Sequence, residues 1–188
     1  MAKAKEARSS VKASALVAGG PGLAKLPAGI PASRSVRDRM DRYNARRDQL
    51  TPDLLRRVRE QRLGTLGRFA VWTVDAPTMR GPGGDVDFCE GGNPGRYRYV
   101  PLDELWIESD LVPPDAAPTL LHEAVECPLM VRHGWTYNRA HDAANLHERA
   151  MRAGVAAGSV VVPALADVVP VVISWLQEHQ PDLLGEDA

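Results

Sequence analysis

The sequence has few aromatic residues, two cysteines and almost no net charge. Aromatic residues make up 5% of the 188 residues, which argues against a stacking platform for single-stranded nucleic acid. The formal net charge of -1 gives no overall field that would attract DNA or a membrane surface. Cys89 and Cys127 are far apart and form no CxxC pair. They therefore indicate a reducing compartment and no disulfide framework.

Long hydrophobic runs are also missing. The N-terminus is basic, but Lys12 and Ser14 interrupt the segment 11–17, which is therefore unlike the apolar part of a signal peptide. The most apolar stretch, 160–176, contains an aspartate and two prolines, so we expect a buried or partner-facing helix there and no membrane span. We therefore expect a protein of the cytoplasm or of a virion that is not secreted by a signal peptide.

The length and composition fit one globular domain with tails, since 44% of the residues are hydrophobic and 25% are charged. We divide the chain into four parts. Residues 1–34 form an extended basic arm, and 35–64 form an arginine-rich helical segment. Residues 65–158 contain a sheet and a two-helix core, and 159–188 form an apolar C-terminal helix.

The fold class that we expect is α+β, with a small antiparallel sheet of about three strands packed against several helices. The clearest strand is Phe69–Val74, which is rich in β-branched and aromatic residues. Short strands are also expected at 97–100 and 104–107, after a glycine- and proline-rich loop from 76 to 95. The stretch Trp106-Ile107 would form an edge of this sheet, where an extended peptide could add as a further strand.

Two arginine-rich helices are expected before the sheet. Ser35 is a suitable N-cap for the first, and Thr51-Pro52-Asp53 starts the second, which Gly64 ends. Their arginines are interleaved with acids, which is typical of a solvated, salt-bridged face. Together with the basic arm they leave binding to a nucleic-acid backbone open, as the interpretation with the least support.

Three helical stretches are expected after the sheet. The first covers about 115–134, and the second covers 137–153 with Thr136 as its N-cap. The segment 160–183 is one helix, or two helices broken at Pro170.

Most side chains that could bind a metal lie in the first two of these helices. His122 and Glu126 are four residues apart and share one face of a helix. His141, Asn145 and Glu148 are spaced by four and three and share one face of the next helix. If these two faces meet, they bring together histidines and carboxylates, which are ligands for zinc or another divalent metal.

The spacing His122-Glu123-x-x-Glu126 is close to the zincin motif H-E-x-x-H. In that motif two histidines hold zinc, and the glutamate after the first is the general base on the bound water. Glu126 replaces the second histidine; a carboxylate also ligates zinc, but it makes the bound water less acidic. We assign His122, Glu126, His141 and Glu148 as candidate metal ligands, Glu123 as the catalytic base, and Asn145 and Tyr137 as groups that orient the ligands.

The same region resembles a pattern of small phage and prophage proteins: a Trp-Ile strand, H-E-x-x-E, and then G-x-[ST]-Y-x-x-A-H-x-x-A-N-x-x-E. The matching residues are Trp106, Ile107, His122, Glu123, Glu126, Gly134, Thr136, Tyr137, Ala140, His141, Ala144, Asn145 and Glu148. The resemblance covers residues 104–152 and implies a core similar to zincin metallopeptidases, with a strand before the His-Glu helix. It leaves the arm, the arginine-rich helices and the C-terminal helix unexplained.

Two functions are compatible with these patterns. The first is a zinc-dependent hydrolase of the metallopeptidase type. The second is a structural component of a phage particle or another large assembly, attached to protein partners through the arm and the C-terminal helix. In that case the His/Glu cluster is structural or vestigial, and a buried hydrogen-bonded network that only fixes helix packing would use the same residues.

Overall fold

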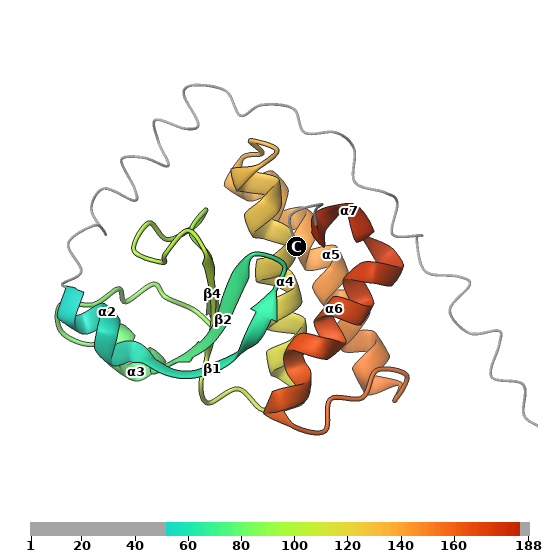
Figure 1. Cartoon of the computed structure of the whole chain (residues 1–188), viewed down its shortest axis with the longest axis horizontal. Coiled ribbons are helices and arrows are strands. Elements are labelled where there is room, and N and C mark those ends of the chain that lie inside the picture. The colour runs from blue at the N-terminus through green and yellow to red at the C-terminus, as the bar shows by residue number, and fades with distance from the viewer. Residues whose placement is uncertain (1–51, 185–188) are drawn as a thin grey trace, which may run out of the picture.

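The computed structural model describes residues 52–184, which adopt the expected α+β fold (Figure 1). The arm at 1–34 and the helix expected to begin at Ser35 lie outside the described residues. The described elements, in chain order, are α2 (Pro52–Val58), β1 (Arg59–Leu66), β2 (Phe69–Val74), α3 (Ala76–Met79), β3 (Gly91–Gly92), β4 (Glu104–Glu108), α4 (Pro113–Val131), α5 (Tyr137–Ala156), a short 3-10 helix (Leu165–Asp167), α6 (Val168–His179) and α7 (Pro181–Leu184).

Within the described part of the chain the sheet has four strands, in the order β1-β2-β4-β3. β1 and β2 form an antiparallel hairpin across a two-residue turn, where Gly67 adopts a φ of 55°. β4 is parallel to β2 and antiparallel to β3. The expected small sheet is therefore present, but it has one more strand than the expected three and is mixed, because the pair β2–β4 is parallel. The long connection between β2 and β4 carries the chain back so that both strands run the same way.

Three local expectations are also wrong. The second arginine-rich helix ends at Val58, and the chain up to Leu66 pairs with β2 as strand β1. The segment 97–100 forms turns, in which the Tyr97 N–H donates to the carbonyl of Asn93 at 2.8 Å. Trp106 lies in the interior of the sheet, because β4 is paired on one side with β2 and on the other with β3.

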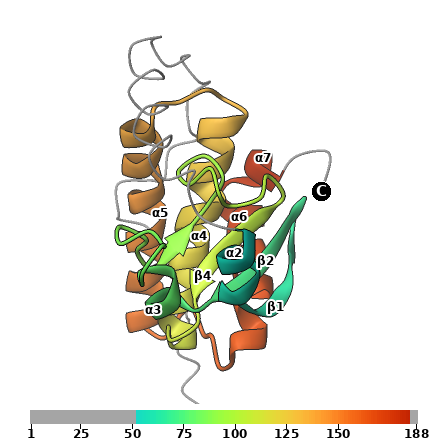
Figure 2. The same cartoon turned by 90° about the vertical axis from the view of Figure 1, so that its left-hand side faces the viewer.

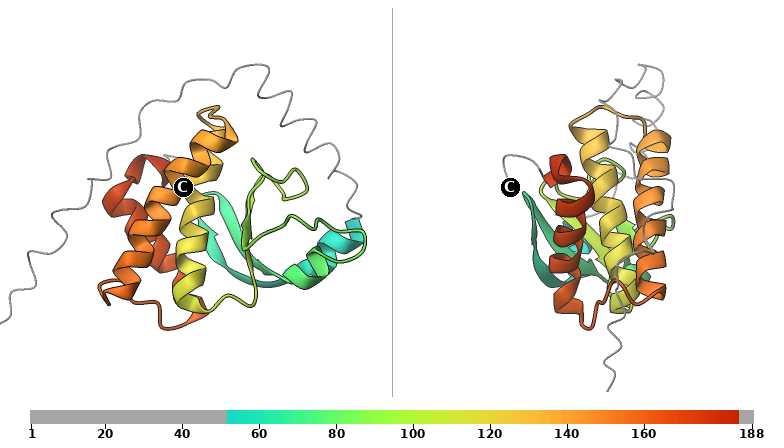
Figure 3. Two further views of the ribbon diagram at one scale, coloured as in Figure 1. Left: turned by 180° about the vertical axis from the view of Figure 1, so that it is seen from behind. Right: turned by 90° about the vertical axis from the view of Figure 1, so that its right-hand side faces the viewer.

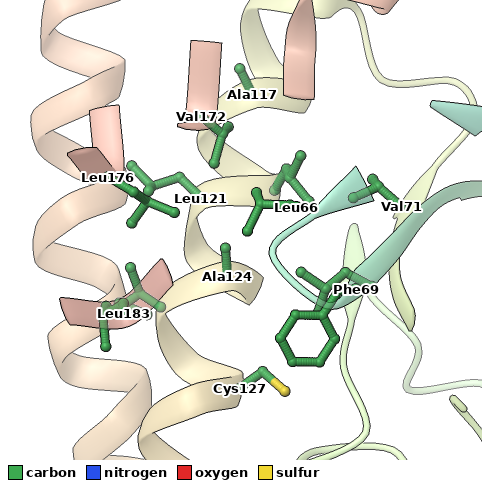
Figure 4. Close-up of a cluster of buried hydrophobic side chains, with 14 of the residues drawn as sticks. Leu66, Phe69, Val71, Ala117, Leu121, Ala124, Cys127, Val172, Leu176 and Leu183 are labelled. Atoms are coloured by element: carbon green, nitrogen blue, oxygen red, sulfur yellow. The ribbon is translucent and has the colours of Figure 1, made fainter. Parts of the chain in front are cut away.

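The two faces of the sheet contact different cores, because neighbouring residues of a strand point in opposite directions. Leu105 and Ile107 of β4 enter a core shared with α4, α5 and α6, whereas Trp106 enters a second core on the other face. Figure 4 shows part of the first core, to which Leu121 of α4 and Leu176 of α6 belong. Burial of each such side chain contributes about 1.5–3 kcal/mol, so α4 is held firmly against the sheet.

The second core holds the loop before β4 in place. It joins α2 and α3 to an aromatic cluster of Phe88, Tyr97, Tyr99 and Trp106, whose neighbouring ring centroids lie 5.3 to 6.5 Å apart. These contacts anchor the glycine-rich loop around β3, which lies next to α4.

The long helices pack side by side (Figures 2 and 3). α4 lies between α5 and the sheet, and α6 contacts both α4 and β1. The C-terminal helix is not broken at Pro170, because this proline lies in the first turn of α6, where its missing N–H would have no partner. α6 ends at His179, before α7 begins. Residues 160–164, expected to be part of the helix, are not helical. None of the helices within 52–184 has both the length and the apolar character needed to cross a membrane.

Candidate metal centre

The close packing of α4 and α5 creates the candidate site. The face of α5 that meets α4 contains Ala140, Ala143 and Ala144, all buried, and these small side chains let the two helices approach. The N-terminus of α5 is capped as expected, since the Thr136 hydroxyl accepts a hydrogen bond from the Arg139 N–H at 3.4 Å. The polar residues at the edge of this contact therefore face one another.

Three side-chain atoms converge at this edge. Nε2 of His122 lies 3.0 Å from Nδ1 of His141 and 3.4 Å from Oε2 of Glu126. The same Glu126 oxygen lies 3.0 Å from His141 Nδ1. His122 and Glu126 are buried and His141 is half-buried, and the three form a group with the geometry of possible metal ligands. We call this group the His/Glu triad.

Glu148 approaches the opposite side of the His122 ring. Nδ1 of His122 donates to Oε2 of Glu148 at 2.8 Å, because an ionised carboxylate can only accept. This hydrogen bond places a proton on Nδ1 and, in the neutral imidazole, leaves Nε2 with the lone pair that faces the triad. Arg152 donates through Nε to Oε1 of Glu148 at 2.9 Å and through Nη1 to Asp115 at 2.9 Å. Glu148 is thus placed to orient His122 and lies outside the triad.

Glu123 and Glu126 are joined by one amide from the glycine-rich loop. Nδ2 of Asn93 donates to Oε2 of Glu123 at 2.6 Å and to Oε1 of Glu126 at 2.9 Å. The backbone of β3 also lies close to the Glu123 side chain, because a Cβ atom added to Gly91 would be 2.8 Å from Oε1 of Glu123. Glu123 is therefore confined between β3 and the triad.

The environment shifts the pKa values of these groups in opposite directions. Burial alone would lower the pKa of His122, but its hydrogen bonds with Glu126 and Glu148 outweigh burial and raise the pKa to about 10. Burial, followed by the negative charge of Glu126, raises the pKa of Glu123 well above its usual value. Burial opposes ionisation of Glu126 as well, but hydrogen bonds with His122 and His141 lower its pKa. Of the two carboxyls, Glu123 therefore takes up a proton first.

The triad opens into a cavity of about 260 Å³. Tyr137 and Asn145 lie in its wall, and the Tyr137 ring stacks on His141 with centroids 5.1 Å apart. The Arg96 guanidinium lies 4.4 Å from the centre of the Tyr137 ring. The wall contains the carboxylates of Asp87, Glu90, Glu123, Glu126 and Glu148. Such a strongly acidic cavity favours a cation.

The structure brings together the seven side chains named from the sequence, but only some of them have atoms in the triad. Three form the triad, Glu123 lies beside it, Glu148 contacts the far side of His122, and Tyr137 and Asn145 line the cavity. Sequence reasoning missed Asn93, whose Gly-Gly-Asn-Pro-Gly setting indicates only a turn. It also missed Arg152, although the Glu148–Arg152 spacing of four residues is a helical ion-pair signal.

Comparisons of the chain with protein-family models, with curated proteins and with solved structures found no match. The resemblance to phage and prophage proteins therefore remains a prediction. The case for a function depends on the residues of the cavity and on their geometry.

Proposed function

We propose that the His/Glu triad binds one divalent metal ion, zinc by its donor set, and that the domain is a metal-dependent hydrolase of the peptidase type. The observation that carries the proposal is the convergence of three donor atoms, 3.0 to 3.4 Å apart, in the wall of a cavity. Tetrahedral zinc with bonds of about 2.0–2.2 Å needs ligand atoms separated by roughly 3.3–3.6 Å. The triad is close to this spacing, since one pair of its atoms is 3.4 Å apart and the other two pairs are 3.0 Å apart.

The donor set also supports a catalytic role over a purely structural one. Structural zinc sites use four protein ligands, whereas catalytic sites use three and leave a position for water or substrate. Two histidines and one glutamate are a ligand set of the catalytic kind. Glu148 accepts a hydrogen bond from the ring nitrogen of His122 that faces away from the triad, as carboxylates do for zinc-binding histidines.

Glu123 is the residue that we assign as general base. It lines the cavity beside the triad, and its raised pKa favours the exchange of a proton near neutral pH. A cation bound at the triad would lower this pKa again, so Glu123 would be ionised and ready to accept a proton. Zinc at this position would supply a Lewis acid and lower the pKa of water.

In the proposed hydrolysis, Glu123 takes a proton from water as the water oxygen forms a bond to the substrate carbonyl carbon. Glu123 then returns that proton to the leaving nitrogen as the C–N bond breaks, so the products are a carboxylic acid and an amine. An extended substrate would not pair with Trp106-Ile107, because β4 is interior to the sheet. Gly91 of the outer strand β3 lies in the cavity wall, close to the side chain of Glu123.

Zinc titration at several pH values tests the metal site. We expect one zinc ion per chain and an affinity that rises with pH by about tenfold per unit. The reason is that His122, with a pKa of about 10, carries a proton on Nε2 at neutral pH, and zinc must displace it. The measurement is isothermal titration calorimetry in buffers of different ionisation enthalpy, which reports the proton released. A chain that binds no zinc between pH 6 and 9 would contradict the proposal.

Substitution of Gly91 by alanine is expected to impair hydrolysis while zinc remains bound. The new Cβ atom would meet the Glu123 carboxylate and displace it, whereas the triad is not in its path. Gly92→Ala is the matched control, since its Cβ atom would meet the Phe88 ring at 2.8 Å and disturb the aromatic core instead. We expect Gly92→Ala to lower the melting temperature without the same loss of activity per folded molecule. Equal losses in both variants would show that strand distortion alone explains the effect.

A second candidate function, a component of a large assembly, is favoured by a separate observation. Val160, Val161, Pro163, Val171 and Trp175 line a shallow cavity of about 390 Å³ beside α6, and Val161 is 66% exposed. The cavity is also lined by Ser159, Asp167, Ser174 and Glu178, so the surface combines apolar and polar groups, as surfaces that contact other proteins do. If the chain is only such a component, zinc binding can persist, but no peptide hydrolysis will depend on Glu123.

A further inference from the structure

Asn93 is a buried residue whose side chain makes four hydrogen bonds. Its Oδ1 accepts from the backbone N–H groups of Gly95 at 2.9 Å and Arg96 at 3.0 Å. Because these two donors occupy the oxygen, the orientation of the amide is determined, and its NH₂ group must face α4. The turn thus presents two N–H donors to the site.

Both of these donors are used on carboxylates of α4. One contacts Oε2 of Glu123 and the other contacts Oε1 of Glu126. Only the second oxygen of Glu126, Oε2, belongs to the triad. The two oxygens of Glu126 therefore have different partners: Oε2 faces the histidines, and Oε1 accepts a hydrogen bond from Asn93 of the loop.

We propose that Asn93 is a positioning residue that keeps a coordination position open at the metal centre, an inference that rests on the proposed function. A carboxylate can bind a metal through one oxygen or through both. The hydrogen bond from Asn93 holds Oε1 of Glu126 away from the triad and so restricts Glu126 to one-oxygen coordination. The fourth position then stays available for water, which distinguishes a catalytic site from a closed one.

The same amide blocks a second way of closing the site. Glu123 lies one residue after a triad member and could itself become the fourth ligand if its carboxylate were free to turn. Its Oε2 is held by Asn93, and its Oε1 and Cγ are packed against the backbone of Gly91. Loss of the Asn93 amide would release Glu123 and Glu126 together, so the metal could take up the second oxygen of Glu126 and an oxygen of Glu123 in addition to the three triad atoms, and its coordination number would rise above four.

The test uses cobalt(II) in place of zinc, because its visible absorption reports coordination number. The variant is Asn93→Ser, since a serine hydroxyl can still accept from the turn N–H groups but is too short to reach the two carboxylates. We expect the wild-type chain to bind one cobalt ion with the intense bands of four-coordinate cobalt. Asn93→Ser should bind one ion as well, with several-fold weaker bands, as expected for five or six ligands.

Thr119→Val is the matched control. Thr119 lies on α4 one turn before His122, and its buried hydroxyl has no hydrogen-bond partner among residues 52–184, so the change preserves shape close to the site. We expect it to retain the wild-type cobalt spectrum. If Asn93→Ser does not fold, Asn93→Asp replaces it, because aspartate keeps the size and the turn acceptor and loses the NH₂ donors. The same weakening of the bands is expected.

The outcomes separate this inference from the proposed function. A folded Asn93 variant with the wild-type cobalt spectrum would overturn the positioning role and leave the metal site intact. The same spectral change in Thr119→Val would also overturn it, since general disturbance of the site would then explain the result. A wild-type chain that binds no cobalt would refute the metal site itself, and the role of Asn93 with it.

Discussion

Substitution of Glu123 by glutamine should lower the rate of peptide hydrolysis by about 10²- to 10⁴-fold, the range typical for loss of a general acid–base group. Glutamine has nearly the same shape, but it cannot accept the proton of the attacking water. The triad does not contain Glu123, so zinc should remain bound with one ion per chain. The expected signature is therefore a loss of kcat with the metal content unchanged.

This prediction is measured with a mixture of quenched fluorescent peptides of random sequence, and zinc is quantified by elemental analysis. Glu90→Gln is the matched control, because Glu90 is a carboxylate in the wall of the same cavity and makes no hydrogen bond to the triad. We expect its rate to stay within a few-fold of wild type. A wild-type rate that Glu123→Gln leaves unchanged would exclude this residue as the base. Absence of hydrolysis in the wild type would favour the assembly function.

Zinc should raise the thermal stability of the wild-type chain, and His122→Ala should abolish most of that gain. A ligand at about 1,000 times its Kd stabilises the folded state by about 4 kcal/mol. For a chain of this size, that corresponds to an increase in Tm of roughly 10 °C. His122 contributes a triad nitrogen and is fixed by Glu148, so its removal eliminates a ligand and the group that organises it.

The measurement is the difference in Tm with and without zinc for each variant, which cancels any effect of the substitution on the metal-free fold. His133→Ala is the control, because His133 is exposed after the end of α4 and takes no part in the triad. It should retain the full shift. A zinc-induced shift that is the same in His122→Ala as in wild type would place the bound metal elsewhere on the chain.

Helical spacing made the two halves of the site predictable. A four-residue interval on an α-helix places two side chains on one face whatever the rest of the fold, so His122 with Glu126, and His141 with Glu148, could be paired from the sequence. The N-cap at Thr136 is similarly local. By contrast, the sequence pattern of β1 does not indicate a strand, because most residues of this outer strand are exposed or half-buried and lack the alternation that marks a strand with one buried face.

Sheet topology could not be read from local patterns. Trp106-Ile107 has the composition of a strand in any position, and only its pairing with both β2 and β3 makes it interior. The segment 97–100 alternates large and charged residues as a strand would, yet Tyr97 and Tyr99 are buried by turns that pack on Trp106. Propensity is a property of a few neighbouring residues, whereas strand order depends on contacts between distant ones.

The sequence by itself determined which groups could act: a histidine and two glutamates on one helix, and a histidine and a glutamate on the next. Only the tertiary structure decided their roles, because roles depend on which atoms approach one another in space. It placed Glu148 on the far nitrogen of His122, brought Asn93 across 30 residues to Glu123, and left three atoms to form the triad. Helical periodicity is encoded locally, but the separation of ligand, base and orienting residue is set by the packing of β3 and α5 against α4.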